Sequence, residues 1–201
     1  MDSRDLFLAS DGAMREVVRR LAPADLDHPV PADWSSTGVP TLRGILALHA
    51  RDEAWVPDLL VGKTMDEVGD SWNGELLGDD PIGSYLALNL RAEEAALNEF
   101  LDLDTAVFHF SYGDYPAREG FVHIAIYRAF QAWMIARLVG MDYSLPPQVV
   151  DGMNEWVVPR VEEFRAIGVF PPAQPVPHDA DAESALLHTT GYWMPPTAPL
   201  A

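Results

Sequence analysis

The 201-residue sequence contains no cysteine and a single lysine, Lys63. Without thiols the chain can form no disulfide, no thiolate nucleophile and no cysteine-ligated metal site. No apolar run approaches the roughly 18 residues that a membrane span needs, and no basic stretch leads into an apolar one at the N-terminus, as a secretory signal would require. We therefore expect a cytoplasmic protein that does not associate with membranes.

Basic residues are scarce as a class, since 13 Lys and Arg face 31 Asp and Glu, for a formal net charge of −18. A chain this acidic repels phosphate backbones, so nucleic-acid binding would have no electrostatic driving force. The apolar content of 48% is ordinary for a globular protein. At this length the sequence predicts one domain with a sizeable core.

Apolar residues recur at helical spacing in five segments, which predict helices at about 3–21, 41–62, 81–102, 116–140 and 147–167. Proline and glycine punctuate these segments in the positions that helix ends favour. Asp80 is expected to be an N-cap, Pro57 to kink the second helix or begin its last turn, and Gly140 to follow the end of the fourth.

The connecting segments have the composition of loops. Residues 23–40 contain four prolines and are expected not to be helical, and residues 63–78 form a polar loop. Residues 105–115 alternate between apolar and polar side chains, which predicts a short extended piece or a hairpin. After residue 170 the chain becomes a proline-rich strap, with one short helical turn expected at 182–188.

Long helices with little strand content favour an all-α fold, in which a four-helix bundle carries an additional C-terminal helix and an extended proline-rich tail. We expect residues 1–170 to form the helical-bundle domain and residues 171–201 to pack on that same domain as the strap.

Two of the expected helices carry polar side chains on otherwise apolar faces. His49 and Glu53 lie four residues apart on the second, and His123, Tyr127 and Gln131 follow at the same spacing on the fourth. Residues four apart share one face of a helix. Such groups can perform acid–base chemistry on a bound molecule. The alternative is that they are hydrogen-bonded residues of the core.

Three further residues are candidates for substrate contact. Arg128 flanks the polar residues of the fourth helix and can pair with an anionic substituent or with an internal carboxylate. Trp34 precedes the second helix, and Met134 lies near the end of the fourth. Large apolar side chains of this kind either pack in the core or line a ligand cavity.

The order Trp34, Leu42, His49, then ARLVG ending at Gly140, then the strap GVFPPAQPVPHDADAESALLHTTG, resembles the actinobacterial branch of the DinB-like superfamily. That branch includes the mycothiol-dependent maleylpyruvate isomerases. The resemblance covers nearly the whole chain. It implies a four-helix bundle in which three side chains hold a divalent metal ion between the second and fourth helices.

The resemblance also implies ligand positions. His49 matches the histidine of the second helix. The fourth-helix motif Glu-x-x-x-His-x-Trp-Asp has Tyr127, Gln131 and Met134 in place of its glutamate, histidine and aspartate. A tyrosine and a glutamine are poor ligands for a divalent ion at neutral pH. We therefore expect a metal-independent descendant of this group without a cofactor.

The leading hypothesis is an enzyme that tailors a secondary metabolite as an isomerase, lyase or cyclase. His49 or His123 is the general base, Glu53 fixes its tautomer, and Tyr127 and Gln131 donate hydrogen bonds to the substrate. One alternative is a mycothiol-dependent enzyme with Zn or Ni on His49, His123 and Glu53. Another is a non-catalytic ligand-binding or partner subunit, associating as a homodimer or with a partner enzyme.

Overall fold

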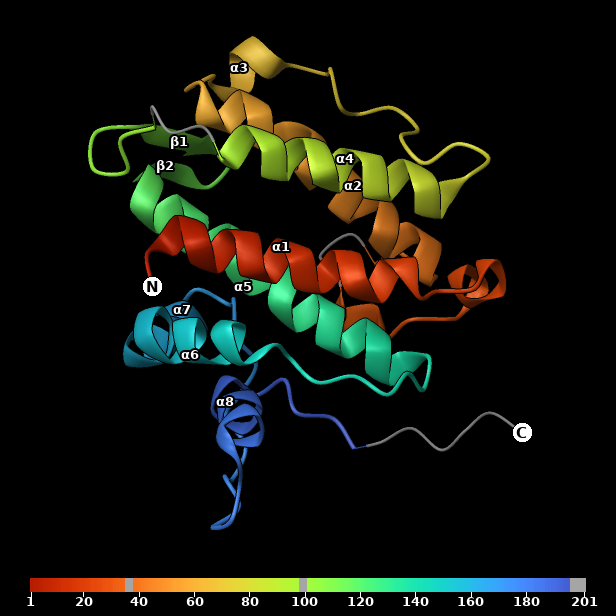
Figure 1. Ribbon diagram of the computed structural model, residues 1–201, viewed down its shortest axis with the longest axis vertical. Coiled ribbons are helices and arrows are strands. Elements are labelled where there is room, and N and C mark those ends of the chain that lie inside the picture. The colour runs from red at the N-terminus through yellow and green to blue at the C-terminus, as the bar shows by residue number, and fades with distance from the viewer. Residues whose placement is uncertain (35–37, 98–100, 196–201) are drawn as a thin grey trace. The chain divides into compact units, whose positions relative to one another are not determined.

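The computed structural model describes residues 1–34, 38–97 and 101–195, and these are mostly helical (Figure 1). They separate into two compact units: Met1–Met14 with Phe121–Ala201, and Arg15–Gly120. Both boundaries fall inside helices, α1 (Ser3–Arg19) and α5 (Ala117–Leu138). The domain boundary expected at residue 170 lies within the first of these units.

In the unit 15–120, helices α2 (Leu42–Leu60) and α4 (Pro81–Ala96) pack side by side (Figure 1). Each begins at a capping side chain. Thr41 accepts a hydrogen bond from the Gly44 backbone N–H, and Asp80 accepts one from the Gly83 backbone N–H at 3.0 Å. These caps satisfy backbone donors that the first turn of a helix leaves without partners. The predicted N-cap at Asp80 is thus confirmed.

The loops of this unit contain more local structure than their composition suggests. Single 3-10 turns occupy Pro23–Asp27 and Ala32–Trp34. A short helix, α3 (Met65–Val68), lies within the expected polar loop, where Thr64 and Glu67 form a capping box. The expected hairpin is present, because β1 (Val107–Phe110) pairs antiparallel with β2 (Gly113–Pro116).

Two expected helices are shorter than periodicity alone predicts. Helix α4 ends at Ala96, and the expected continuation at 98–100 lies outside the described residues. At its expected end, the Asp102 carboxylate accepts the Asp104 backbone N–H at 2.9 Å. Such local side-chain bonds compete with helix formation. The single helix expected at 147–167 is broken into α6 (Pro147–Trp156), a 3-10 turn and α7 (Val161–Ala166). Pro159 lies at the break and lacks the N–H that a continuous helix requires.

In the other unit, α5 is apolar around most of its circumference, which is typical of a buried helix. Phe121, Phe130 and Trp133 of this helix are each at most 2% exposed. The α5 helix ends before Gly140, which has the left-handed conformation (φ 68°) expected of a residue after a helix end.

The strap contains a full helix, α8 (Ala182–Thr190), in place of the short turn expected at 182–188. Asp181 caps its start, and Gly191 ends it with φ 85°. A Cβ atom at Gly191 would lie 2.5 Å from the Pro172 carbonyl oxygen, so the close approach of the strap also requires glycine. Arg165 holds the strap by donating to the carbonyl oxygens of Pro171 and Thr189.

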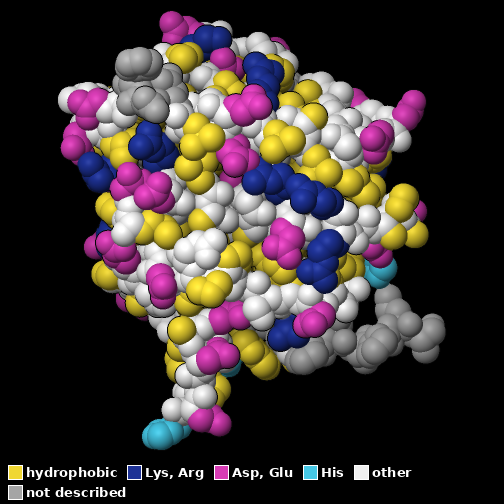
Figure 2. All heavy atoms as spheres, in the orientation of Figure 1, with side chains coloured by type: hydrophobic (Ala, Val, Ile, Leu, Met, Phe, Trp, Pro, Cys, Tyr) yellow, Lys and Arg dark blue, Asp and Glu magenta, His cyan; other side chains and the backbone are white. Residues whose placement is uncertain are grey.

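Among the described residues, no helix combines the length and apolar character that crossing a membrane requires. Acidic side chains are dispersed among basic and apolar ones over the face shown in Figure 2. The high negative charge is thus spread over this face rather than gathered at one place.

Candidate functional site

Helix α2 places two ionisable side chains in the protein interior. His49 and Glu53 are both 0% exposed, and their spacing of four residues sets them one turn apart on the same face. Their neighbours on that face are Leu42, Ile45 and Leu46, which are also buried. An ionisable group inside an apolar environment is costly unless polar partners compensate for its lost hydration.

Helix α4 provides those partners for Glu53. The Tyr85 hydroxyl donates to Glu53 Oε1 at 3.0 Å, and the Asn89 amide donates to the same oxygen at 3.5 Å. Asn89 in turn accepts a hydrogen bond from Arg15 Nη1 at 2.9 Å, and Arg15 also pairs with Glu93. The polar network therefore leads from a fully buried carboxylate to Arg15 and Glu93, whose side chains are partly exposed.

Tyr85 and Asn89 are functional candidates that reasoning from the sequence missed. The signal was present, because Tyr85, Asn89 and Glu93 follow one another at intervals of four residues on a helix. This is the same spacing that singled out His123, Tyr127 and Gln131. Polar side chains in such a row share one face and can meet a partner helix together.

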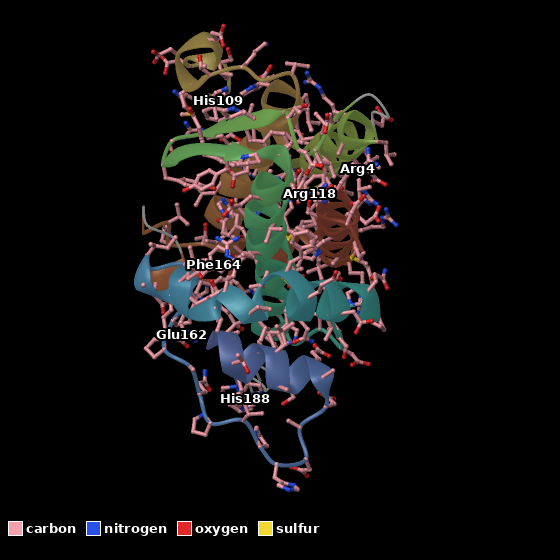
Figure 3. All side chains as sticks on the ribbon, turned by 90° about the vertical axis from the view of Figure 1, so that its left-hand side faces the viewer. Arg4, His109, Arg118, Glu162, Phe164 and His188 are labelled. Atoms are coloured by element: carbon pink, nitrogen blue, oxygen red, sulfur yellow. The ribbon has the colours of Figure 1, made fainter. Side chains whose placement is uncertain are left out.

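The polar row of α5 belongs to the unit that contains residues 121–201. The His123 ring contacts Phe164 of α7 edge-on, with ring centroids 5.8 Å apart. Phe164 is labelled in Figure 3. Tyr127 is half-buried, and Gln131 is 3% exposed. Within the described residues, Gln131 Nε2 has no hydrogen-bond partner. His49 and Glu53 belong to the unit 15–120.

The expected substrate-binding residues are all buried. Arg128 Nε donates to Asp11 Oδ1 at 2.9 Å, and the side chains are 1% and 0% exposed. The Arg128 guanidinium also lies over the Phe7 ring, 5.5 Å from its centroid. Trp34 and Met134 are each 7% exposed. The internal carboxylate partner foreseen for Arg128 is therefore Asp11.

The described side chains do not form a recognisable metal site. In the ranges 1–34, 38–97 and 101–195, no group of three or more His, Asp and Glu residues is arranged to hold a metal ion. The ligand set His49, His123 and Glu53 draws its members from both units. The Glu53 partners Tyr85 and Asn89 offer a phenol and an amide, which are poor ligands for Zn or Ni.

The remaining histidines described have other surroundings. His109 bonds Asp114 across the hairpin at 2.8 Å. On α8, His188 Nδ1 lies 2.8 Å from the Ser184 carbonyl oxygen, and its ring stacks on Trp193 at 4.8 Å (Figure 3). His28 is half-buried in a loop, and His178 is exposed in the strap.

Asp58 of α2 has a lowered pKa. Burial raises the pKa of Asp58, but hydrogen bonds from Lys63 and Trp72 outweigh this effect and hold it below its ordinary value of 3.8. Lys63 Nζ lies 2.6 Å from one oxygen, and Trp72 Nε1 donates to the other at 2.8 Å. These bonds attach the loop 63–78 to the end of α2 and lie outside the network around Glu53.

No protein-family model matches the chain, and no curated protein or solved structure shows significant similarity to it. The resemblance to the DinB-like group therefore stays a prediction. The function must be inferred from the side chains of the candidate site.

Proposed function

We propose that this protein is a metal-independent enzyme on a DinB-like four-helix bundle, and that it isomerises, cleaves or cyclises a small organic molecule by acid–base catalysis. The observation that carries the proposal is the fully buried His49–Glu53 pair, whose carboxylate is held by the Tyr85 hydroxyl and the Asn89 amide. The proposal locates catalysis in the unit 15–120, between α2 and α4.

Burying Glu53 in the interior costs free energy, because its carboxylate loses hydration. A leucine at position 53 would bury no polar group, whereas a carboxylate must be desolvated. Clusters of buried ionisable groups with polar partners are enriched at functional sites, because catalysis needs protonation states that the environment controls. His49 lies one turn from Glu53, and histidine is the residue type whose ordinary side-chain pKa is nearest to neutral pH.

The chemistry follows from the residue types. His49 removes a proton from carbon or oxygen of the substrate, and the carboxylate of Glu53 stabilises the resulting imidazolium. Tyr85 holds the Glu53 carboxylate in place by donating its one hydroxyl hydrogen to Oε1. When the same proton returns at a different atom, the net reaction is an isomerisation. When a leaving group departs instead, it is an elimination.

The experiment uses proton exchange, because this reports on acid–base chemistry before the natural substrate is known. The full chain is incubated in D₂O with a panel of 2-oxo and 3-oxo acids, and deuterium incorporation at the carbon next to the carbonyl group is followed by NMR. We expect wild-type protein to accelerate exchange of at least one acid. We expect His49→Gln to lower that rate by at least about 100-fold.

Two controls separate catalysis from folding. His178→Gln makes the same change in the exposed strap and should leave the exchange rate unaltered. Thermal unfolding of His49→Gln shows whether this variant remains folded. The proposal would be contradicted if folded His49→Gln kept the wild-type exchange rate. It would also be contradicted if the wild-type protein exchanged every acid no faster than buffer does.

Metal content distinguishes the mycothiol-dependent alternative. Elemental analysis of untagged protein should find no tightly held ion, and added zinc or nickel should not raise the thermal unfolding midpoint. About one ion per chain, lost in His49→Gln, would instead favour a divalent site with mycothiol as cosubstrate.

A further inference from the structure

The β1–β2 hairpin has two chemically distinct faces. Phe108 is paired with Tyr115, and Phe110 with Gly113, so the aromatic side chains of the two strands fall on the same face. His109 is paired with Asp114 on the opposite face, where the imidazole bonds the carboxylate. Because successive side chains of a strand point to opposite faces, the aromatic groups lie on one face of the hairpin and the polar pair lies on the other.

The aromatic face runs from a buried end to an exposed one. Phe108 is 1% exposed and packs so closely on Gly120 that a Cβ atom there would clash with the ring. Phe110 and Tyr115 are half-buried, and Tyr112 in the turn is 61% exposed. Phe108 thus anchors the hairpin, while Tyr112 presents its ring to solvent.

The rings of Phe110, Tyr112 and Tyr115 form a contiguous cluster. The Phe110 and Tyr112 rings stack nearly parallel, with centroids 5.0 Å apart and an interplanar angle of 5°. Tyr115 lies 6.1 Å from Phe110 and 5.8 Å from Tyr112. We call Phe110, Tyr112 and Tyr115 the aromatic cluster. A tyrosine ring that faces solvent leaves apolar surface in contact with water, which is unfavourable. A contiguous aromatic patch commonly marks an interaction surface.

A carboxylate lies near the aromatic cluster, and two others lie near His109 of the same hairpin. Asp52 of α2 is exposed and lies close enough to Tyr112 for its charge to act on the phenol. Asp114 bonds His109 on the opposite face of the hairpin, and Glu67 of α3 interacts electrostatically with the same histidine. Aromatic ring faces attract cations through their quadrupole, and carboxylates attract them directly. The local chemistry and the net charge of −18 therefore favour a positively charged occupant.

We propose that the aromatic cluster, together with Asp52, docks an arginine-bearing segment of a partner protein. Guanidinium groups stack on aromatic rings and pair with carboxylates in the same contact. The rings stack on one another at a hairpin turn, whereas small ligands are taken up in concave sites that enclose them. An extended basic segment can instead place successive arginines along the turn. This surface is independent of the proposed catalytic pair.

The test measures binding of a labelled peptide, acetyl-Arg-Gly-Arg-Gly-Arg-amide, to the full chain by fluorescence anisotropy at fixed ionic strength. Tyr112→Ala removes the most exposed ring and should weaken binding by about two- to fivefold. Tyr112→Phe keeps the ring and should bind as the wild type does. Because Tyr112 lies in an exposed turn, both variants should unfold at the wild-type temperature.

Charge controls separate a docking site from general attraction to an acidic protein. Asp52→Asn and Asp151→Asn remove the same charge from exposed positions, one beside the aromatic cluster and one on α6. We expect Asp52→Asn to weaken binding by at least about twofold more than Asp151→Asn does. Equal effects of the two variants, or undiminished binding in Tyr112→Ala, would overturn the proposal. Binding of arginine amide as tight as that of the peptide would also overturn it, in favour of a small-cation site.

Discussion

Two buried carboxylates of this protein are compensated in different ways. Asp11 of α1 is paired with the guanidinium of Arg128, and both side chains are at most 1% exposed. Glu53 of α2 is equally buried, but its Oε1 accepts hydrogen bonds from the neutral groups of Tyr85 and Asn89. Both arrangements offset the cost of desolvating a carboxylate.

The difference between them concerns what happens when a proton is added. Protonating Asp11 would leave the Arg128 cation buried beside a neutral acid, so the ion pair favours one fixed charge state. The hydroxyl and the amide that hold Glu53 Oε1 are neutral, so protonating Glu53 leaves neither of these two partners with an unbalanced charge. The pair Asp11–Arg128 is thus suited to a structural role, and Glu53 to a role in which protons move.

The largest expected effect comes from breaking the ion pair. Arg128→Met removes the cation and leaves Asp11 buried, which we expect to lower the free energy of unfolding by about 3–5 kcal/mol. That is a large share of the roughly 5–15 kcal/mol by which such domains are stable. Urea unfolding at neutral pH measures this loss.

The double variant Asp11→Leu/Arg128→Met provides the control. Replacing both charges with apolar side chains of similar size should recover most of the stability, because neither member of the pair is then left as a buried charge. If the double variant were as unstable as Arg128→Met alone, packing rather than charge would explain the loss, and the contrast with Glu53 would lose its basis.

A smaller effect is expected at the neutral network. Tyr85→Phe removes the hydroxyl that donates to Glu53, and we expect a loss of about 1–2 kcal/mol, since a buried acceptor loses one partner. Tyr192→Phe makes the same change where the hydroxyl donates to the Val169 carbonyl near the surface, and it should cost less than about 0.5 kcal/mol. Urea unfolding of both variants tests the difference. Equal losses would mean that the Tyr85 bond contributes no more than a surface one.

Much of the fold was predictable because its signals are local. Asp80 and Gly140 act through a hydrogen bond or a dihedral angle within a few residues of their own position. The hairpin at 107–116 followed from alternation in the same way. The break at Pro159 escaped prediction because Val157, Val161 and Phe164 keep a helical spacing across it. Apolar periodicity persists through a 3-10 turn, whereas the backbone hydrogen bonds do not.

The candidate site was predictable only in part. His49 and Glu53 stood out because they interrupt an apolar face, and that pattern lies within one helix. Tyr85 and Asn89 depend on the packing of α4 against α2, and their partner is 32 or more residues away in the sequence. The Asp11–Arg128 pair spans 117 residues. Periodicity identifies which residues share a face, but it does not identify what that face meets.

The smallest expected effect concerns Asp58, a carboxylate that combines both kinds of partner near the surface, the Lys63 cation and the Trp72 indole. Its folded-state pKa is depressed below 3.8, so its contribution to stability is present above that value and is lost as the pH falls through the folded-state pKa. Because Lys63 is 49% exposed, solvent screens the pair and the contribution should stay below about 1 kcal/mol. We expect acidification from about pH 6 to about pH 3 to destabilise wild type more than Asp58→Asn, as measured by urea unfolding. Asp151→Asn should follow wild type over the same range, and parallel curves for wild type and Asp58→Asn would show that the bonds to Lys63 and Trp72 do not stabilise the ionised form.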